Sequence, residues 1–157
     1  MGKPVLQLLR FVLLVLFLGS LLAQAFVPAL ASEAARTFPE VGPLVVAYSI
    51  AGIVVIACCQ VVLFVIWRLL SMISGGMIFT RQSLRWVDII ISSGALATAV
   101  NTGVWVHLLV VAGGGPGIIL WLLVSLAGGV AFVLLMLVMR GLLELAIADR
   151  TELDGVI

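Results

Sequence analysis

Four long apolar stretches, separated by short polar or glycine-rich segments, make up most of the chain. A helix needs about 20 apolar residues to cross the roughly 30 Å hydrocarbon core of a bilayer, and each stretch reaches that length. We therefore predict an all-α integral membrane protein with four transmembrane helices, at residues 11–31, 44–67, 86–112 and 118–139. The segments between them are too short for a folded domain outside the membrane. Residues 1–157 are thus expected to form a single membrane domain that ends in a tail at 140–157.

These helices are expected to form an antiparallel bundle. The glycine-rich link at 113–117 is a tight breaker, which makes the third and fourth helices antiparallel neighbours. Small residues at four-residue spacing let helix backbones approach closely in a membrane. The third helix carries two such stripes, Gly94, Thr98 and Thr102, and Ala95, Ala99 and Gly103. Because Ser125 and Gly129 offer a matching stripe on the fourth helix, we predict the third helix at the centre of the bundle. The same stripes would also suit a homo-oligomer.

Positive charge lies almost entirely at one end of the predicted helices. Arg36 lies at one end, and the other basic residues lie at the opposite end: Lys3, Arg10, Arg68, Arg81, Arg85, Arg140 and Arg150. Short segments rich in Lys and Arg stay on the cytoplasmic side of a membrane. We therefore predict that the N-terminus, the C-terminus and the middle loop are cytoplasmic, in a multi-pass protein of the bacterial plasma membrane.

The first apolar stretch has a second interpretation. A basic flank, the apolar run at 11–18 and small residues at 23–25 or 29–31 resemble a cleavable secretory signal. Cleavage would leave three helices and an external N-terminus. The apolar stretch is longer than a usual signal, which favours a retained transmembrane helix.

The overall composition excludes several classes of protein. Hydrophobic residues make up 64% of the chain and charged residues only 10%, whereas a soluble domain has about a quarter charged residues. The net charge is +1, from 8 Lys and Arg against 7 Asp and Glu. Since there is no basic excess to neutralise phosphates, we expect no direct binding of nucleic acid.

Polar side chains within the predicted helices are expected to lie in a layer. A rise of 1.5 Å per residue from the inner helix ends brings Gln24, Asn101 and Ser125 to a common depth, with Gln60 closer to the inner end. Such groups have no water to bond, so they should hydrogen-bond across helices. Packing is the plainer interpretation of this layer, and a small polar cavity for a ligand or an ion is the alternative.

Residues that could carry chemistry are few. Asp88 lies near the inner boundary with Arg81 and Arg85, where we expect a local ion pair. The alternative is that the two arginines form a cationic rim for anionic lipid or a partner. His107 has no second metal ligand near it in sequence, and the adjacent cysteines at 58–59 lie mid-helix, where thiols stay protonated. We therefore expect no catalytic residue, no metal, no cofactor and no enzymatic activity.

The middle loop and the tail form the predicted partner-binding surface. Phe79 and Leu84 have the spacing of a hydrophobic staple at a helix start, which would fix the loop geometry. The tail has one apolar side and more acidic than basic residues, so it is expected either to fold back on the arginine-bearing loop or to present a docking face. The candidate partner-binding residues are Arg68, Phe79, Arg81, Arg85, Glu152 and Asp154.

The chain resembles a bacterial family catalogued as domain of unknown function 2975. The resemblance lies in the four predicted helices, in the run 76–80 (GMIFT) followed by Leu84 and Arg85, and in the ending from Leu142 to the run 152–157 (ELDGVI). It extends over nearly the whole chain. It implies no established activity, but many members are encoded beside a small helix-turn-helix regulator, which suggests a membrane protein that holds or releases a transcription factor.

Two functions follow as expectations. The first is a non-enzymatic regulatory or accessory membrane protein whose cytoplasmic loop and tail bind a soluble partner, such as a helix-turn-helix regulator. The alternative is a small transporter, or an accessory subunit of a larger membrane complex, that uses the polar layer to bind a solute or lipid.

Overall fold

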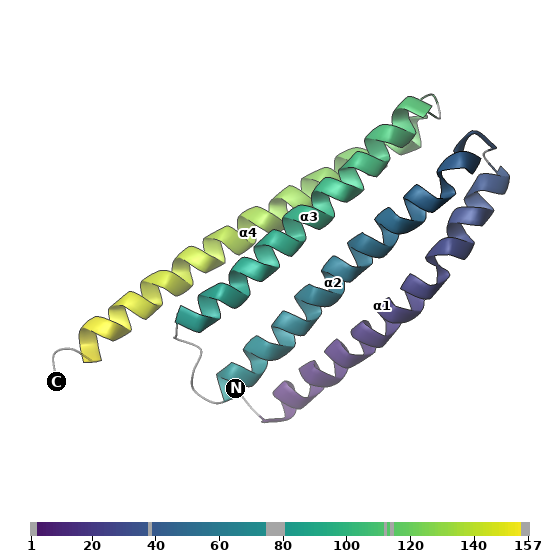
Figure 1. Cartoon of the computed structure of the whole chain (residues 1–157). Coiled ribbons are helices and arrows are strands. Elements are labelled where there is room, and N and C mark those ends of the chain that lie inside the picture. The colour runs from purple at the N-terminus through teal and green to yellow at the C-terminus, as the bar shows by residue number, and fades with distance from the viewer. Residues whose placement is uncertain (1–2, 38, 75–80, 112, 114, 155–157) are drawn as a thin grey trace.

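The structure is a computed structural model, and it describes residues 3–37, 39–74, 81–111, 113 and 115–154. Four α-helices account for nearly all of this: α1 (Lys3–Thr37), α2 (Val45–Ser74), α3 (Arg81–Val111) and α4 (Pro116–Asp154). A 3-10 helix, η1 (Pro39–Leu44), joins the first two (Figure 1). All four α-helices are long and apolar enough to cross a membrane. The prediction of an all-α protein with four transmembrane helices is therefore confirmed.

Each helix is longer than the apolar stretch that predicted it. The apolar stretch marks the part that suits hydrocarbon, whereas the backbone hydrogen bonds of a helix continue until a breaker interrupts them. Pro116 starts α4 at the first helical position, where the missing N–H of proline costs nothing. No comparable breaker follows Met139, and α4 continues to Asp154.

The helices run antiparallel and pack in chain order, so that α1 contacts α2, α2 contacts α3 and α3 contacts α4 (Figure 1). Within the described residues, no extended contact joins α1 to α4. The turn between α3 and α4 passes through Gly113, whose φ of 70° is a left-handed conformation that favours glycine. Both α2 and α3 lie between two neighbours, as predicted for α3.

The outer surface of the molecule is apolar. Large hydrophobic side chains are exposed along all four helices, with Leu30, Val46, Val110 and Leu120 each more than 60% exposed. In water such continuous apolar exposure would drive aggregation, whereas in a bilayer the lipid chains cover it. The protein is thus a multi-pass membrane protein whose buried core is small.

The described part of the tail, residues 140–154, does not turn back toward the described part of the middle loop, which corrects one of the two expectations for it. Residues 140–154 continue α4 as one straight helix that reaches beyond the start of α3 (Figure 1). The expectation of a fold-back used the opposite charges of tail and loop. Exposed opposite charges attract too weakly in water to offset the loss of the helical hydrogen bonds that a sharp bend requires.

Candidate functional site

The tightest glycine contacts in the described part of the chain lie between α3 and α4. A Cβ added at Gly129 would overlap the hydroxyl and methyl groups of Thr98, and one added at Gly94 would lie 2.6 Å from Cε1 of Phe132. Both glycines therefore let the facing side chain rest against bare backbone. The predicted match between the small residues of α3 and Gly129 is confirmed at Thr98, whereas Gly94 faces Phe132, which the prediction did not include.

An ion-pair cluster joins the same two helices at their arginine-bearing end. Arg140 Nε donates to Asp88 Oδ1 at 2.6 Å, and Arg140 Nη1 donates to Glu144 Oε2 at 3.1 Å. The Arg140 and Asp88 side chains are 35% and 50% exposed, so water screens the pair in part. One arginine thus bridges α3 to α4 and also stabilises the next turn of α4.

Asp88 was expected to pair locally with Arg81 or Arg85, and for Arg85 this expectation is wrong. The partner lies on α4 because the antiparallel turn brings Arg140 opposite Asp88. The two residues stand almost equally far from the glycine-rich link at 113–117, a signal in the sequence that could have identified the pair.

Two aromatic contacts lie at the opposite end of the helices. Tyr48 Oη and His107 Nδ1 are hydrogen-bonded at 2.9 Å and join α2 to α3, with the rings in an edge-on arrangement. Trp105 and Trp121 stack with their ring centroids 6.5 Å apart and join α3 to α4. His107 therefore has a hydrogen-bond partner that sequence reasoning missed.

The expected polar layer is divided between different partners. Gln60 Nε2 donates to Gln24 Oε1 at 3.0 Å, which joins α2 to α1. Ser125 Oγ donates to the carbonyl oxygen of Leu122 in its own helix. Asn101 lies on α3, and none of the structure's described hydrogen bonds joins it to Gln24 or Ser125.

The bond between Gln24 and Gln60 corrects the expectation that the Gln60 side chain lies too close to the inner end of α2 to reach Gln24. Side chains in an α-helix lean toward its N-terminus. Gln24 therefore leans toward the N-terminal end of α1, and Gln60 leans the opposite way because α2 is antiparallel. Two glutamines whose Cα atoms differ in depth can thus meet, and a count of backbone rise alone does not reveal it.

The largest described cavity is a groove of about 460 Å³ to which all four helices contribute. Its lining is mostly small or apolar, and it consists of Leu16, Ser20, Cys58, Cys59, Val62, Leu63, Ser93, Gly94, Ala97, Thr98, Gly129 and Phe132. The hydroxyls of Ser20 and Thr98 donate to carbonyl oxygens of their own helices. The groove therefore suits an apolar occupant better than a polar solute, and none of Gln24, Asn101 and Ser125 lines it.

The candidate partner-binding residues are spread over three helices. Arg68 lies exposed near the end of α2, and Arg85 lies exposed near the start of α3. Arg81, Glu152 and Asp154 lie in described helices, but their side chains are outside the description, and Phe79 lies outside the described residues altogether. Those that lie in described helices are close to the end of α2, the start of α3 or the end of α4, and these three helix ends lie on the same side of the bundle.

A comparison with protein families decides where the chain belongs. Residues 29–157 match the family described as Protein of unknown function (DUF2975). The chain belongs to the DUF2975 family. The match includes α2, α3 and α4, whereas most of α1 precedes it, so the resemblance extends over less of the chain than expected. Searches of curated proteins and of solved structures find no match.

Proposed function

We propose that this DUF2975 protein is a non-enzymatic regulatory or accessory protein of the bacterial plasma membrane. Its arginine-bearing end faces the cytoplasm and binds a soluble partner, for which the family resemblance favours a helix-turn-helix regulator. The observation that carries the proposal is the C-terminal part of α4, which continues as a helix beyond the start of α3 (Figure 1).

The C-terminal part of α4 has the character of a docking helix. Leu142 and Leu145 are 57% and 63% exposed and lie three residues apart, so they share one face of the helix. Glu144 and Asp149 stand exposed on the same stretch, which indicates contact with water rather than with lipid chains. Exposed leucines beside carboxylates favour a partner that buries the leucines in a groove and leaves the acids at the rim.

The ion pair between Asp88 and Arg140 supports this role. It fastens α4 to α3 just before the exposed leucines, so the following turns of α4 start from a fixed point. A docking helix that is already ordered loses little conformational entropy when its partner binds.

The alternative is an accessory subunit of a larger membrane complex, and the groove of about 460 Å³ favours it over a solo transporter. The groove's apolar wall suits lipid or an apolar helix from another subunit, whereas a transported polar solute would need convergent polar groups.

Affinity purification of the full chain from bacterial membranes tests the proposal. We expect a soluble helix-turn-helix protein to co-purify with the wild type and to be lost from the double variant Leu142→Ala/Leu145→Ala. The matched control is Leu135→Ala/Leu137→Ala, which removes two exposed leucines from the preceding turns of the same helix. Co-purification of integral membrane subunits in place of a soluble regulator would support the alternative. Equal retention of the regulator by all three proteins would contradict docking on α4.

A further inference from the structure

A cavity of about 280 Å³ lies between α2 and α3, toward the end opposite the arginine-bearing one. Tyr48 and His107, which are hydrogen-bonded to each other, both line it. From His107 the lining extends along α3 to Val100, a rise of about 10 Å toward the middle of the helix. His107 and Gly103 are exposed, so the cavity opens on the outer surface of the bundle. It therefore has a polar pair at one end and an apolar interior.

The pair formed by Tyr48 and His107 retains a free hydrogen-bond donor. A neutral phenol and a neutral imidazole carry one polar hydrogen each. Only one of these hydrogens lies between Tyr48 Oη and His107 Nδ1, whichever group donates. Among the described residues, no other hydrogen bond involves either side chain. The second hydrogen is thus available to an oxygen acceptor on a ligand in the cavity.

The rest of the wall is small and uncharged. Ala47 and Ala51 lie four residues apart on one face of α2, Gly103 lies on α3, and the remaining lining residues are a leucine and two valines. Side chains no larger than a methyl group allow a flat molecule to approach the backbone closely. The volume is just below the range of about 300–1,000 Å³ for sites that enclose a whole small molecule. It therefore suits a planar ring whose tail remains in the bilayer.

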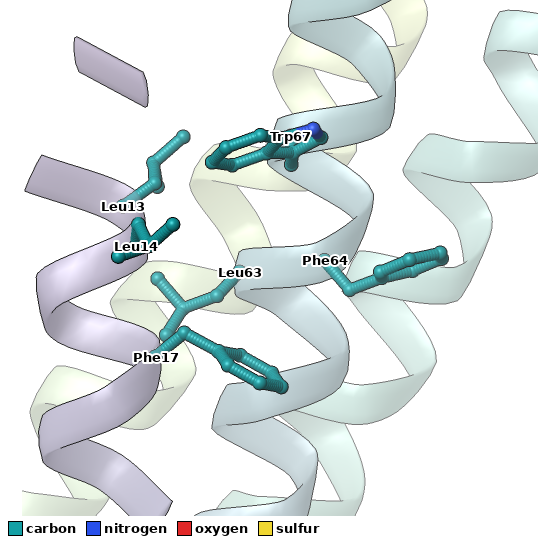
Figure 2. A pocket seen from close by; sticks show the side chains of 6 residues that line it. All are labelled: Leu13, Leu14, Phe17, Leu63, Phe64 and Trp67. Atoms are coloured by element: carbon teal, nitrogen blue, oxygen red, sulfur yellow. The ribbon is translucent and has the colours of Figure 1, made fainter. Parts of the chain in front are cut away.

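The charges at this end do not favour the headgroup of an anionic phospholipid. Arg36 is the basic residue of this end, and it lies on α1, where it pairs with Glu33 at 3.4 Å. The cavity of about 230 Å³ between α1 and α2 offers no comparable hydrogen-bonding pair, because leucine and phenylalanine side chains form most of its wall (Figure 2). The cavity at Tyr48 and His107 thus favours an uncharged ligand that accepts a hydrogen bond.

We propose that this cavity binds the ring of an isoprenoid quinone. A quinone is uncharged, dissolves in the bilayer, and has a planar ring with carbonyl oxygens. One carbonyl oxygen accepts the hydrogen that the Tyr48–His107 pair leaves free, and the ring lies against Ala47, Ala51 and Gly103. The tail leaves through the open side of the cavity into the lipid.

Tryptophan fluorescence tests the proposal, because quinones quench it at short range. The protein is the full chain with Trp67→Phe and Trp86→Phe, in nanodiscs of dioleoyl phosphatidylcholine. The remaining tryptophans, Trp105 and Trp121, stack on each other at the same end as the cavity. With decylubiquinone as the probe, we expect quenching that saturates. Quenching that only rises linearly with the quinone content of the bilayer would overturn the proposal, since the abundant phospholipid would then occupy the cavity equally well.

Gly103→Leu tests the place of binding. An added Cβ at Gly103 meets nothing within 4 Å, so a leucine can extend into the cavity without separating the helices. We expect saturable quenching to weaken more than tenfold. The matched control is Gly128→Leu, because Gly128 has equally open surroundings but does not line this cavity. Unchanged affinity in the Gly103→Leu variant, or an equal loss in the control, would overturn the proposal.

The double variant Tyr48→Phe/His107→Leu tests the hydrogen bond. It should weaken binding about two- to tenfold, the contribution of one neutral hydrogen bond. Gln24→Leu/Gln60→Leu removes another interhelical bond and should leave the affinity unchanged. Should the double variant fail to fold, competition on the wild type replaces it. Dodecylbenzene has a ring and a chain but no oxygen, so it should not relieve the quenching, and displacement of the quinone by it would contradict the role of the pair. The soluble partner is proposed to bind α4 at the other end, so either proposal can fail alone.

Discussion

The α3–α4 and α1–α2 interfaces use opposite means to hold two apolar helices together. Between α3 and α4, Gly94 and Gly129 let Phe132 and Thr98 rest on bare backbone. Between α1 and α2, large side chains such as Leu13, Phe17 and Trp67 line a cavity. The α3–α4 interface has its tightest contacts at two glycines, whereas large side chains line much of the α1–α2 interface.

This difference matters because lipid tails are as apolar as leucine. Helices in a bilayer gain little by burying large apolar side chains against each other, and they gain most from close van der Waals packing and interhelical hydrogen bonds. The α3–α4 pair therefore has a fixed register, and the Asp88–Arg140 pair reinforces it. The α1–α2 pair retains space that another molecule can occupy.

The largest expected effect comes from Gly129→Ala. The added methyl group meets Thr98 directly, so α3 and α4 must separate, and overpacking of this kind costs about 1–3 kcal/mol. Thermal unfolding in detergent should show a clear fall in Tm. Gly128→Ala is the matched control, because nothing lies within 4 Å of its added Cβ, and its Tm should stay level or rise.

A smaller effect is expected from breaking the ion pair between α3 and α4. Asp88→Asn or Arg140→Gln should each lower Tm modestly, because the pair is partly exposed and water screens it. The two changes together should cost less than the sum of the single effects, since either one alone already removes the bond. Strict additivity in this double-mutant cycle would mean that the contact is not formed in the membrane protein.

The hydrogen bond at the α1–α2 interface should matter less again. Gln24→Leu or Gln60→Leu removes one interhelical bond, which is worth about 0.6 kcal/mol on average in a membrane. Unfolding in a denaturing detergent should reveal a coupling of that size between the two positions. A coupling near zero would show that the glutamines do not pair.

The smallest effect is expected from Gly52→Ala, which adds a methyl group between α1 and α2 as Gly129→Ala does between α3 and α4. Its added Cβ would lie 3.1 Å from Val27 Cγ1, and a shift of that side chain by a few tenths of an ångström relieves the contact. The Tm should therefore change little. If Gly52→Ala lowered Tm as much as Gly129→Ala does, the two interfaces would not differ in how tightly they pack.

The sequence was sufficient to predict the four helices and the close α3–α4 approach. Apolar length follows from the thickness of the bilayer, and the spacing of Gly94 and Thr98 follows from the helical repeat, so both are local properties. The Asp88–Arg140 pair was missed because it depends on the exact register across a turn. The Gln24–Gln60 bond was missed because side-chain lean, not backbone rise, brings the two amides together.

We propose that both ends of the chain lie on the cytoplasmic side of a bilayer that it crosses four times, and the proposed function depends on this orientation. Single cysteines placed at positions 7, 33, 115 and 149 in a Cys58→Ala/Cys59→Ala background can be probed in intact bacteria with a membrane-impermeant maleimide. We expect labelling at positions 33 and 115, and labelling at 7 and 149 only after the cells are permeabilised. Labelling at position 149 in intact cells would contradict the account.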